Sequence, residues 1–164
     1  MRARVAWLAA LLAALLVQTA LIPPFIPEAW RPDFTRSLVL WLALTGVPGG
    51  GVYLSFVAGL AVDIVSGGPP GFTAVCRLVI YAFARPWRGV FELRGIIFII
   101  GPFAVLADTV AVLLLKNVIF LNQMDSLFLI SIGARQILVE IFAVPLAFAA
   151  LEKMTGFKTE EPLL

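Results

Sequence analysis

The stretch from residue 49 to residue 72, GGGVYLSFVAGLAVDIVSGGPPGF, decides the fold of this chain. Small residues and one carboxylate recur in it at every fourth position: Gly51, Ser55, Gly59, Asp63 and Gly67. Residues four apart share one face of a helix, and apolar residues separate them, so a helix is expected over 51–65. A stripe of small residues lets a second helix approach closely, as helices do in lipid. The stripe also turns Asp63 toward that helix and away from acyl chains, where a lone carboxylate is costly.

The composition of the whole chain is that of an integral membrane protein. Of its 164 residues, 62% are hydrophobic and 13% are charged, and the mean hydropathy is +1.04. Soluble domains hold about 45–50% apolar and about 25% charged residues. So few polar side chains cannot cover a water-soluble globule, and one membrane-embedded bundle without a separate soluble domain is expected. The net charge of +2 provides no basic surface for nucleic acid.

Turns rich in proline and glycine divide the chain into six apolar segments, which predicts an all-α bundle of six transmembrane helices. Proline interrupts helices because it lacks an N–H donor, but it suits a first turn, as at Pro32 before Asp33. The first segment also resembles a secretory signal peptide, but its apolar run is long enough to span a bilayer, which favours an uncleaved helix. The expected spans are residues 5–22, 33–47, 51–65, 72–84, 95–120 and 127–151, followed by a cytoplasmic tail at 152–164.

The second segment is short for a membrane span. At 1.5 Å per residue it measures roughly 22 Å, against about 30 Å for the hydrocarbon core of a bilayer. Arg36 lies near its start. We therefore expect the Arg36 side chain to reach toward the interface, or the bilayer to thin locally.

An even number of spans places both termini on the same side of the membrane. Lysine and arginine are more frequent in the cytoplasmic segments of multi-pass proteins. With the termini inside, the cytoplasmic segments hold Arg2, Arg4, Arg85, Arg88, Arg94, Lys153 and Lys158. The outer segments hold Arg31, Arg36 and Lys116. The excess predicts cytoplasmic termini.

Charged residues at membrane depth are expected to form two pairs between antiparallel helices. The helix rise puts Asp63 about 18 Å and Arg77 roughly 21 Å from the inner membrane edge, which favours an Asp63–Arg77 pair. The same estimate brings Asp108 and Arg135 to similar levels and favours a second pair. Glu140 lies deeper toward the cytoplasm, on another face of its helix. Such charges fix which helices meet, contact a partner or ligand, or line a transport path, and structural pairing is the favoured interpretation.

The sequence holds no arrangement typical of catalysis or of a bound cofactor. It has no histidine and a single cysteine, Cys76, which excludes the common zinc clusters and a histidine base. The glycine-rich segments lack the Lys-Ser/Thr of a phosphate-binding loop and adjoin apolar helices. We therefore expect no enzyme activity, no cofactor and no metal site.

Three segments give the chain a resemblance to the rod shape-determining protein MreD family, over nearly its whole length. They are QTALIPP at 18–24, the Pro-Asp pair at 32–33, and GLAVDIVSGGPPGFTA at 59–74. The last is the most specific, because it is similar to the family's Gly-Leu-x-x-Asp-x-x-x-Gly followed by Leu-Gly-x-x-Ala. Two positions depart from the pattern: Pro70 replaces an apolar residue, and Arg77 stands where the family tends to be apolar.

The resemblance implies a multi-pass protein of the bacterial inner (cytoplasmic) membrane with six spans and no catalysis of its own. It implies a scaffold of the cell-elongation complex, the elongasome, which carries out lateral peptidoglycan synthesis and maintains rod shape. The implied partners are MreC, through its transmembrane span and juxtamembrane part, and indirectly MreB, RodA and a class-B penicillin-binding protein. A bundle with almost no mass outside the membrane contacts membrane lipid and partner helices, so the MreC span is expected in a lateral groove.

The alternative is the substrate-binding membrane component of an energy-coupling-factor vitamin transporter, also a six-span bundle and thought to be similar to the MreD family in fold. Such a component needs a cavity lined by several polar or aromatic groups, and the outer loops of this sequence offer few. Ala6, Ala10 and Ala14 match the coupling stripe expected in its first helix by composition alone. A small ligand that co-purifies one-to-one would favour the transporter, and a bitopic partner would favour the scaffold.

Overall fold

The computed structural model describes residues 2–27, 30–45, 50–88, 93–119 and 126–155. These residues form six α-helices, so the predicted all-α fold class is confirmed. The helices are α1 Arg2–Leu16, α2 Phe34–Thr45, α3 Gly51–Ser66, α4 Phe72–Ala84, α5 Leu93–Ile119 and α6 Ser126–Thr155. A π-helical turn, η1 Val17–Leu21, continues α1, and a 3-10 turn, η3 Arg85–Trp87, follows α4.

The last helix is longer than predicted. α6 runs to Thr155, past its predicted end at residue 151, so residues 152–155 of the predicted tail are helical. Leu151 to Met154 are residue types that favour helix, and the first glycine comes at position 156. The rest of the predicted tail, 156–164, lies outside the described residues.

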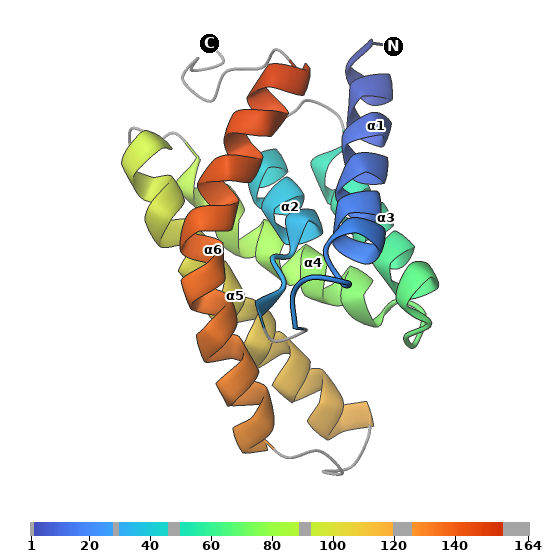
Figure 1. The fold of residues 1–164 in the computed structure, drawn as a ribbon, viewed down its shortest axis with the longest axis vertical. Coiled ribbons are helices and arrows are strands. Elements are labelled where there is room, and N and C mark those ends of the chain that lie inside the picture. Colours follow the sequence, from blue (N-terminus) through green and yellow to red (C-terminus); the bar gives the residue numbers. More distant parts are fainter. Residues whose placement is uncertain (1, 28–29, 46–49, 89–92, 120–125, 156–164) are drawn as a thin grey trace.

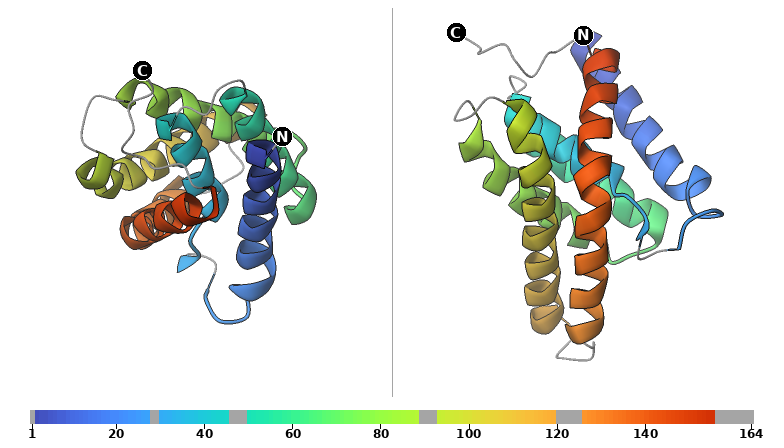
Figure 2. Two further views of the ribbon diagram at one scale, coloured as in Figure 1. Left: turned by 90° about the horizontal axis from the view of Figure 1, so that it is seen from above. Right: turned by 60° about the vertical axis from the view of Figure 1, so that its left-hand side comes forward.

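Consecutive helices run in alternating directions around a central α2 (Figures 1 and 2). α2 packs against α1, α3, α4, α5 and α6. α3 pairs closely with α4, and α5 with α6. One end of the α5–α6 pair extends past the other helices, while the start of α1 and the end of α6 lie at the opposite end (Figure 1). This arrangement makes α2 the helix that all the others enclose.

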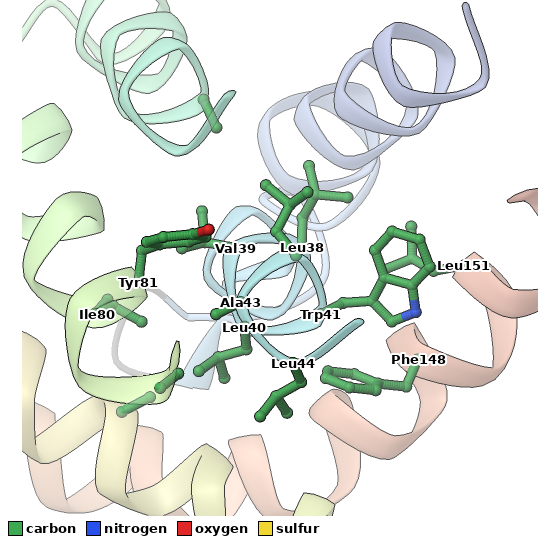
Figure 3. Close-up of a cluster of buried hydrophobic side chains, with 14 of the residues drawn as sticks. Leu38, Val39, Leu40, Trp41, Ala43, Leu44, Ile80, Tyr81, Phe148 and Leu151 are labelled. Carbon is green, nitrogen blue, oxygen red and sulfur yellow. The ribbon is translucent and has the colours of Figure 1, made fainter. Parts of the chain in front are cut away.

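The core of the bundle is α2 and the side chains that face it. Residues 35–44 of α2 are all buried. Trp41 lies 5.9 Å from Trp7 of α1, measured between ring centroids, and it reaches toward Phe148 and Leu151 of α6 (Figure 3). Because protein surrounds α2, its backbone and side chains need no match to the thickness of a bilayer.

The expectation that Arg36 reaches toward the membrane interface is therefore wrong. Arg36 is 3% exposed and lies inside the bundle. Comparing the length of α2 with the thickness of the bilayer assumes that lipid surrounds this helix. Here the neighbouring helices surround it instead, and they supply carboxylates that bind the guanidinium.

The stripe of small residues on α3 lies against α4. Gly51, Ser55, Gly59 and Asp63 are all buried. A Cβ added to Gly59 would lie 2.6 Å from the backbone nitrogen of Ala74, and one added to Gly51 would lie 2.8 Å from the Tyr81 ring. Larger residues at these positions would push the two helices apart. The absence of a side chain at Gly51 and Gly59 therefore allows the close approach of α3 and α4.

Gly67 does not belong to this contact, contrary to the prediction. It ends α3 with a φ of 66° and is exposed, and a Cβ added to it would meet nothing within 4 Å. Its role is conformational, because a left-handed residue after a helix is usually glycine. Gly67 keeps the four-residue spacing, but it follows the last residue of α3 and so does not share the helix face of the other four residues.

One helix of the described part of the chain is long and apolar enough to cross a membrane. It is α5, over Phe98–Leu115. Shorter apolar helices lie at Trp7–Leu21, Phe34–Thr45 and Gly51–Ser66. The six crossings and the side on which the termini lie therefore stay predictions.

Candidate functional site: a buried charge cluster

Five charged side chains from four helices meet inside the bundle. We call them the buried charge cluster: Asp33 and Arg36 at the start of α2, Arg77 of α4, Asp108 of α5 and Glu140 of α6. Both arginines and Glu140 are at most 3% exposed. The cluster draws one or two residues from each helix, so it forms only when the four helices are packed together.

Asp33 caps the N-terminus of α2, and this position brings its carboxylate into the cluster. Its Oδ1 accepts a hydrogen bond from the backbone N–H of Arg36 at 3.0 Å and from the Thr35 hydroxyl at 2.6 Å. A carboxylate at this position satisfies an N–H that has no partner in the helix and faces the positive end of the helix dipole. The other oxygen, Oδ2, accepts a hydrogen bond from Arg77. Asp33 thus joins the start of α2 to α4.

Arg36 connects α2 to both long helices. Its Nη2 donates to Asp108 of α5 at 2.6 Å, and its Nη1 donates to Glu140 of α6 at 3.2 Å. Nη2 also lies 3.4 Å from the side-chain oxygen of Gln136. Glu140 accepts a second hydrogen bond from the backbone N–H of Asp33, at 3.1 Å. The first turn of α2 is thereby held against α6 by main chain and side chain together.

Arg77 completes the cluster from α4. Besides Asp33, it contacts Asp108, with 3.4 Å between Nη1 and Oδ1. The carboxylate of Asp108 therefore lies between the two arginines and joins α5 to α2 and α4. A bridging carboxylate of this kind makes each ion pair depend on the other, because moving one guanidinium changes the position of the charge that holds the second.

The cluster is dense but incompletely satisfied. Three carboxylates face two guanidiniums, so the fully ionised cluster carries one net negative charge. Within the described residues, three of its buried polar atoms make no hydrogen bond: the Nε atoms of Arg36 and Arg77, and Oε2 of Glu140. Replacing buried ion pairs by apolar residues is often neutral or stabilising, whereas removing one partner is strongly destabilising. A cluster like this one therefore specifies which helices meet more than it adds to stability.

The predicted Asp63–Arg77 pair is wrong. The Asp63 carboxylate instead accepts hydrogen bonds from the backbone N–H groups of Gly71 at 2.8 Å and Thr73 at 3.0 Å, with Ala74 at 3.5 Å. These N–H groups form the start of α4, whose N-cap, Gly71, has no side chain to supply a cap. The turn between α3 and α4 brings them back to Asp63, and Arg77 lies about one turn further along α4.

The predicted Asp108–Arg135 pair is also wrong. Asp108 binds the two arginines described above, whereas Arg135 is exposed on α6. Glu140 and Gln136, four residues apart, share the face of α6 that turns toward α2. Arg135 is about 100° further round the helix, since successive residues are separated by that angle. Among the described residues no carboxylate lies within ion-pairing distance of it.

Asp33 and Arg36 are the two residues of the cluster that the sequence analysis does not pair with other charges. A detectable feature was present: the two charges stand three residues apart before an apolar segment, SLVLWLAL at 37–44. Charges so close to a wholly apolar helix require partners nearby. An unbroken apolar segment also indicates a helix buried on every side.

The chemistry of the cluster is that of a structural contact. In the residues that the structure describes, no group of three His, Cys, Asp or Glu side chains could hold a metal ion. Each of the three carboxylates has at least one oxygen on an arginine. The arrangement joins four helices and leaves no paired acid and base facing open space.

The fold and the cluster define a class: an all-helical bundle protein of membrane-protein composition, whose buried charges bind one another. Within that class the chain belongs to the rod shape-determining protein MreD family, whose family model matches residues 1–154. The predicted family is thereby confirmed. MreD proteins are membrane proteins with a role in determining rod shape, and the family is generally non-catalytic. Comparison with curated proteins and with solved structures gave no match, so the expected likeness to energy-coupling-factor components stays a prediction.

Proposed function

We propose that this chain is a non-catalytic scaffold of the elongasome in the bacterial inner membrane, and that it holds MreC by the transmembrane span of that partner. MreB, RodA and a class-B penicillin-binding protein would join the complex through MreC, and both termini of this chain would lie in the cytoplasm. Membership of the MreD family supports the shape-determining role. The finer statement rests on how the surface of the bundle is built.

The buried charge cluster favours a rigid scaffold over a transport path. Its arginines bind carboxylates of the same chain, and side chains of α2 fill the centre of the bundle. The surface left for partners is apolar helix faces, such as Phe142 of α6, 76% exposed, and Ile64 of α3, 73% exposed. A partner that is itself a membrane helix fits such a surface.

The observation that carries the proposal is an apolar groove between α4 and α5. Its volume is about 510 Å³, and it runs along the part of α5 that is long and apolar enough to cross a membrane. Val79 of α4 and Leu106 of α5 are among its walls. Ala107 and Ala111, four residues apart on α5, also line it. Small residues at that spacing, between large ones, allow a second membrane helix to approach closely.

The test is co-purification with MreC of variants that fill the groove. Leu106→Trp places a large ring in it, and Leu138→Trp is a matched control on the surface of α6. The two leucines are 48% and 55% exposed, and only Leu106 lines the groove. We expect Leu106→Trp to reduce the MreC recovered with the chain and Leu138→Trp to leave it unchanged.

Two results would contradict the proposal. Equal recovery of MreC with both variants would remove the groove as the docking site. Unchanged recovery when the MreC span is replaced by an unrelated apolar span would mean that the two proteins meet outside the membrane.

A further inference from the structure

A second pocket lies where the start of α3 meets the end of α4. Its volume is about 530 Å³. The walls combine the first turn of α3, at Gly50 and Gly51, with Tyr81 and Arg85 from α4 and η3 and the apolar side chains of Phe56 and Leu78. None of the described residues that line it is a carboxylate. The pocket is thus positive on one side and apolar on the other.

The positive side begins with backbone donors that have no partner within α3. Gly50 is the N-cap of α3 and makes no capping hydrogen bond through a side chain. The first hydrogen bond within α3 is donated by Leu54 to the carbonyl of Gly50, at 2.8 Å. The N–H groups before Leu54 therefore point out of the helix, where the dipole favours an anion.

An independent feature of the pocket is the hydroxyl of Tyr81. This residue is 7% exposed, and its side chain lies beside Val39 of α2 (Figure 3). The ring lies 2.8 Å from the place where a Cβ on Gly51 would stand, so the hydroxyl lies over the first turn of α3. It makes no hydrogen bond to any residue that the structure describes. A phenolic hydroxyl that lines the pocket can donate a hydrogen bond to an anion bound there.

Arg85 supplies the full charge. Its guanidinium carbon lies 5.9 Å from the centroid of the Tyr81 ring, a cation–π distance. Arg85 itself is exposed at the mouth of the pocket. A guanidinium, a hydroxyl and helix N-terminal N–H groups are the donors that bind a phosphate group.

We propose that this pocket binds the phosphodiester headgroup of an anionic glycerophospholipid. The phosphate meets the first turn of α3, the Tyr81 hydroxyl and Arg85, and the glycerol and upper acyl carbons lie along the apolar wall. That wall continues onto the outer face of α3, where Val52 and Phe56 are 50% and 38% exposed. Free phosphate would gain nothing from apolar contacts, whereas a lipid uses both halves of the pocket.

The test is native mass spectrometry of the full chain in a neutral detergent. Phosphatidylglycerol is titrated in one arm, phosphatidylcholine with the same acyl chains in a second, and inorganic phosphate competes with phosphatidylglycerol in a third. Arg85→Gln removes the charge and Tyr81→Phe removes only the hydroxyl. Arg88→Gln is the matched control, because this exposed arginine does not line the pocket. Far-UV circular dichroism without lipid checks that each variant is folded.

We expect one phosphatidylglycerol to bind more tightly than phosphatidylcholine. Arg85→Gln should weaken its binding about tenfold and Tyr81→Phe roughly threefold, as the loss of a charged and a neutral hydrogen bond predicts. Arg88→Gln should change it little. An equal loss with Arg88→Gln would overturn the site in favour of a diffuse basic surface. Displacement by inorganic phosphate at equal concentration would overturn the lipid as the ligand, and equal binding of both lipids would overturn the role of charge.

Discussion

Removing the charge of Arg36 should damage the bundle more than any other single change of charge. This guanidinium binds Asp108 at 2.6 Å and Glu140 at 3.2 Å, and it lies 3.6 Å from Asp33. Arg36→Gln leaves three carboxylates beside a single guanidinium, Arg77. Removing one partner of a buried ion pair costs about 3–5 kcal/mol, so we expect the free energy of unfolding to fall by about that amount.

A double-mutant cycle isolates the pair itself. Asp108→Asn keeps the shape of the side chain and removes the single surplus negative charge of the ionised cluster, so it should cost less than Arg36→Gln. The double variant should then lose less stability than the sum of the two, with a coupling energy of about 1–3 kcal/mol, as for residues in one network. Reversible unfolding in mixed micelles, followed by far-UV circular dichroism, gives the four free energies.

Arg135 provides the matched control. It is exposed on α6, and sequence reasoning pairs it with Asp108, whereas the structure does not. A cycle between Arg135→Gln and Asp108→Asn should be additive within about 0.5 kcal/mol. Coupling of Asp108 to Arg135 rather than to Arg36 would refute the geometry of the cluster.

Three further changes test the packing around the cluster by the same unfolding measurement. Asp63→Asn should lower the free energy of unfolding by about 1–2 kcal/mol by weakening the cap of α4. Its effect should add to that of Arg77→Met, because the two side chains do not touch. Coupled effects of the two substitutions would contradict their separation. Gly59→Ala should cost about 1–3 kcal/mol, since its Cβ would collide with the backbone of α4, and Gly68→Ala, where a Cβ fits, should be nearly neutral. Trp41→Ala should cost about 3–5 kcal/mol through the cavity that it leaves in the core; a loss below about 1 kcal/mol would show that α2 is not central.

Helices and their close contacts could be predicted where the pattern is local. The four-residue spacing of Gly51, Ser55, Gly59 and Asp63 indicates both a helix and the face that a neighbour covers. The structure buries all four and places Gly51, Gly59 and Asp63 against α4 or the turn before it. Proline and glycine mark the turns, so the predicted and observed helix bounds differ by only a few residues. Such features depend on residues within one or two turns of each other.

The partners of the charges could not be predicted from depth alone. Helix rise estimates the level of a side chain in the membrane but not the direction in which it points. Asp108 and Arg135 have similar estimated levels, yet Gln136 and Glu140 define the inner face of α6 and Arg135 lies off it. The direction follows only from the packing of several helices, which one sequence does not contain.

The role of α2 was missed for a related reason. A comparison of its short length with the thickness of a bilayer assumes that lipid surrounds it, whereas five other helices enclose it. Arg36 was therefore expected at an interface and lies 3% exposed among carboxylates. Its unbroken apolar segment after Asp33 and Arg36 was the observation in the sequence that favoured burial on all sides.

The most direct test of the proposed scaffold is disulfide cross-linking to the MreC span in native membranes. Cysteine is placed at Leu106 in the groove or at Leu138 on α6, in a chain whose buried Cys76 is replaced by alanine. A set of cysteines along the MreC span supplies the second thiol. The proposal predicts cross-links from position 106 that repeat with helical periodicity along the MreC span and few or none from position 138. Cross-links from position 138 with none from position 106 would contradict it.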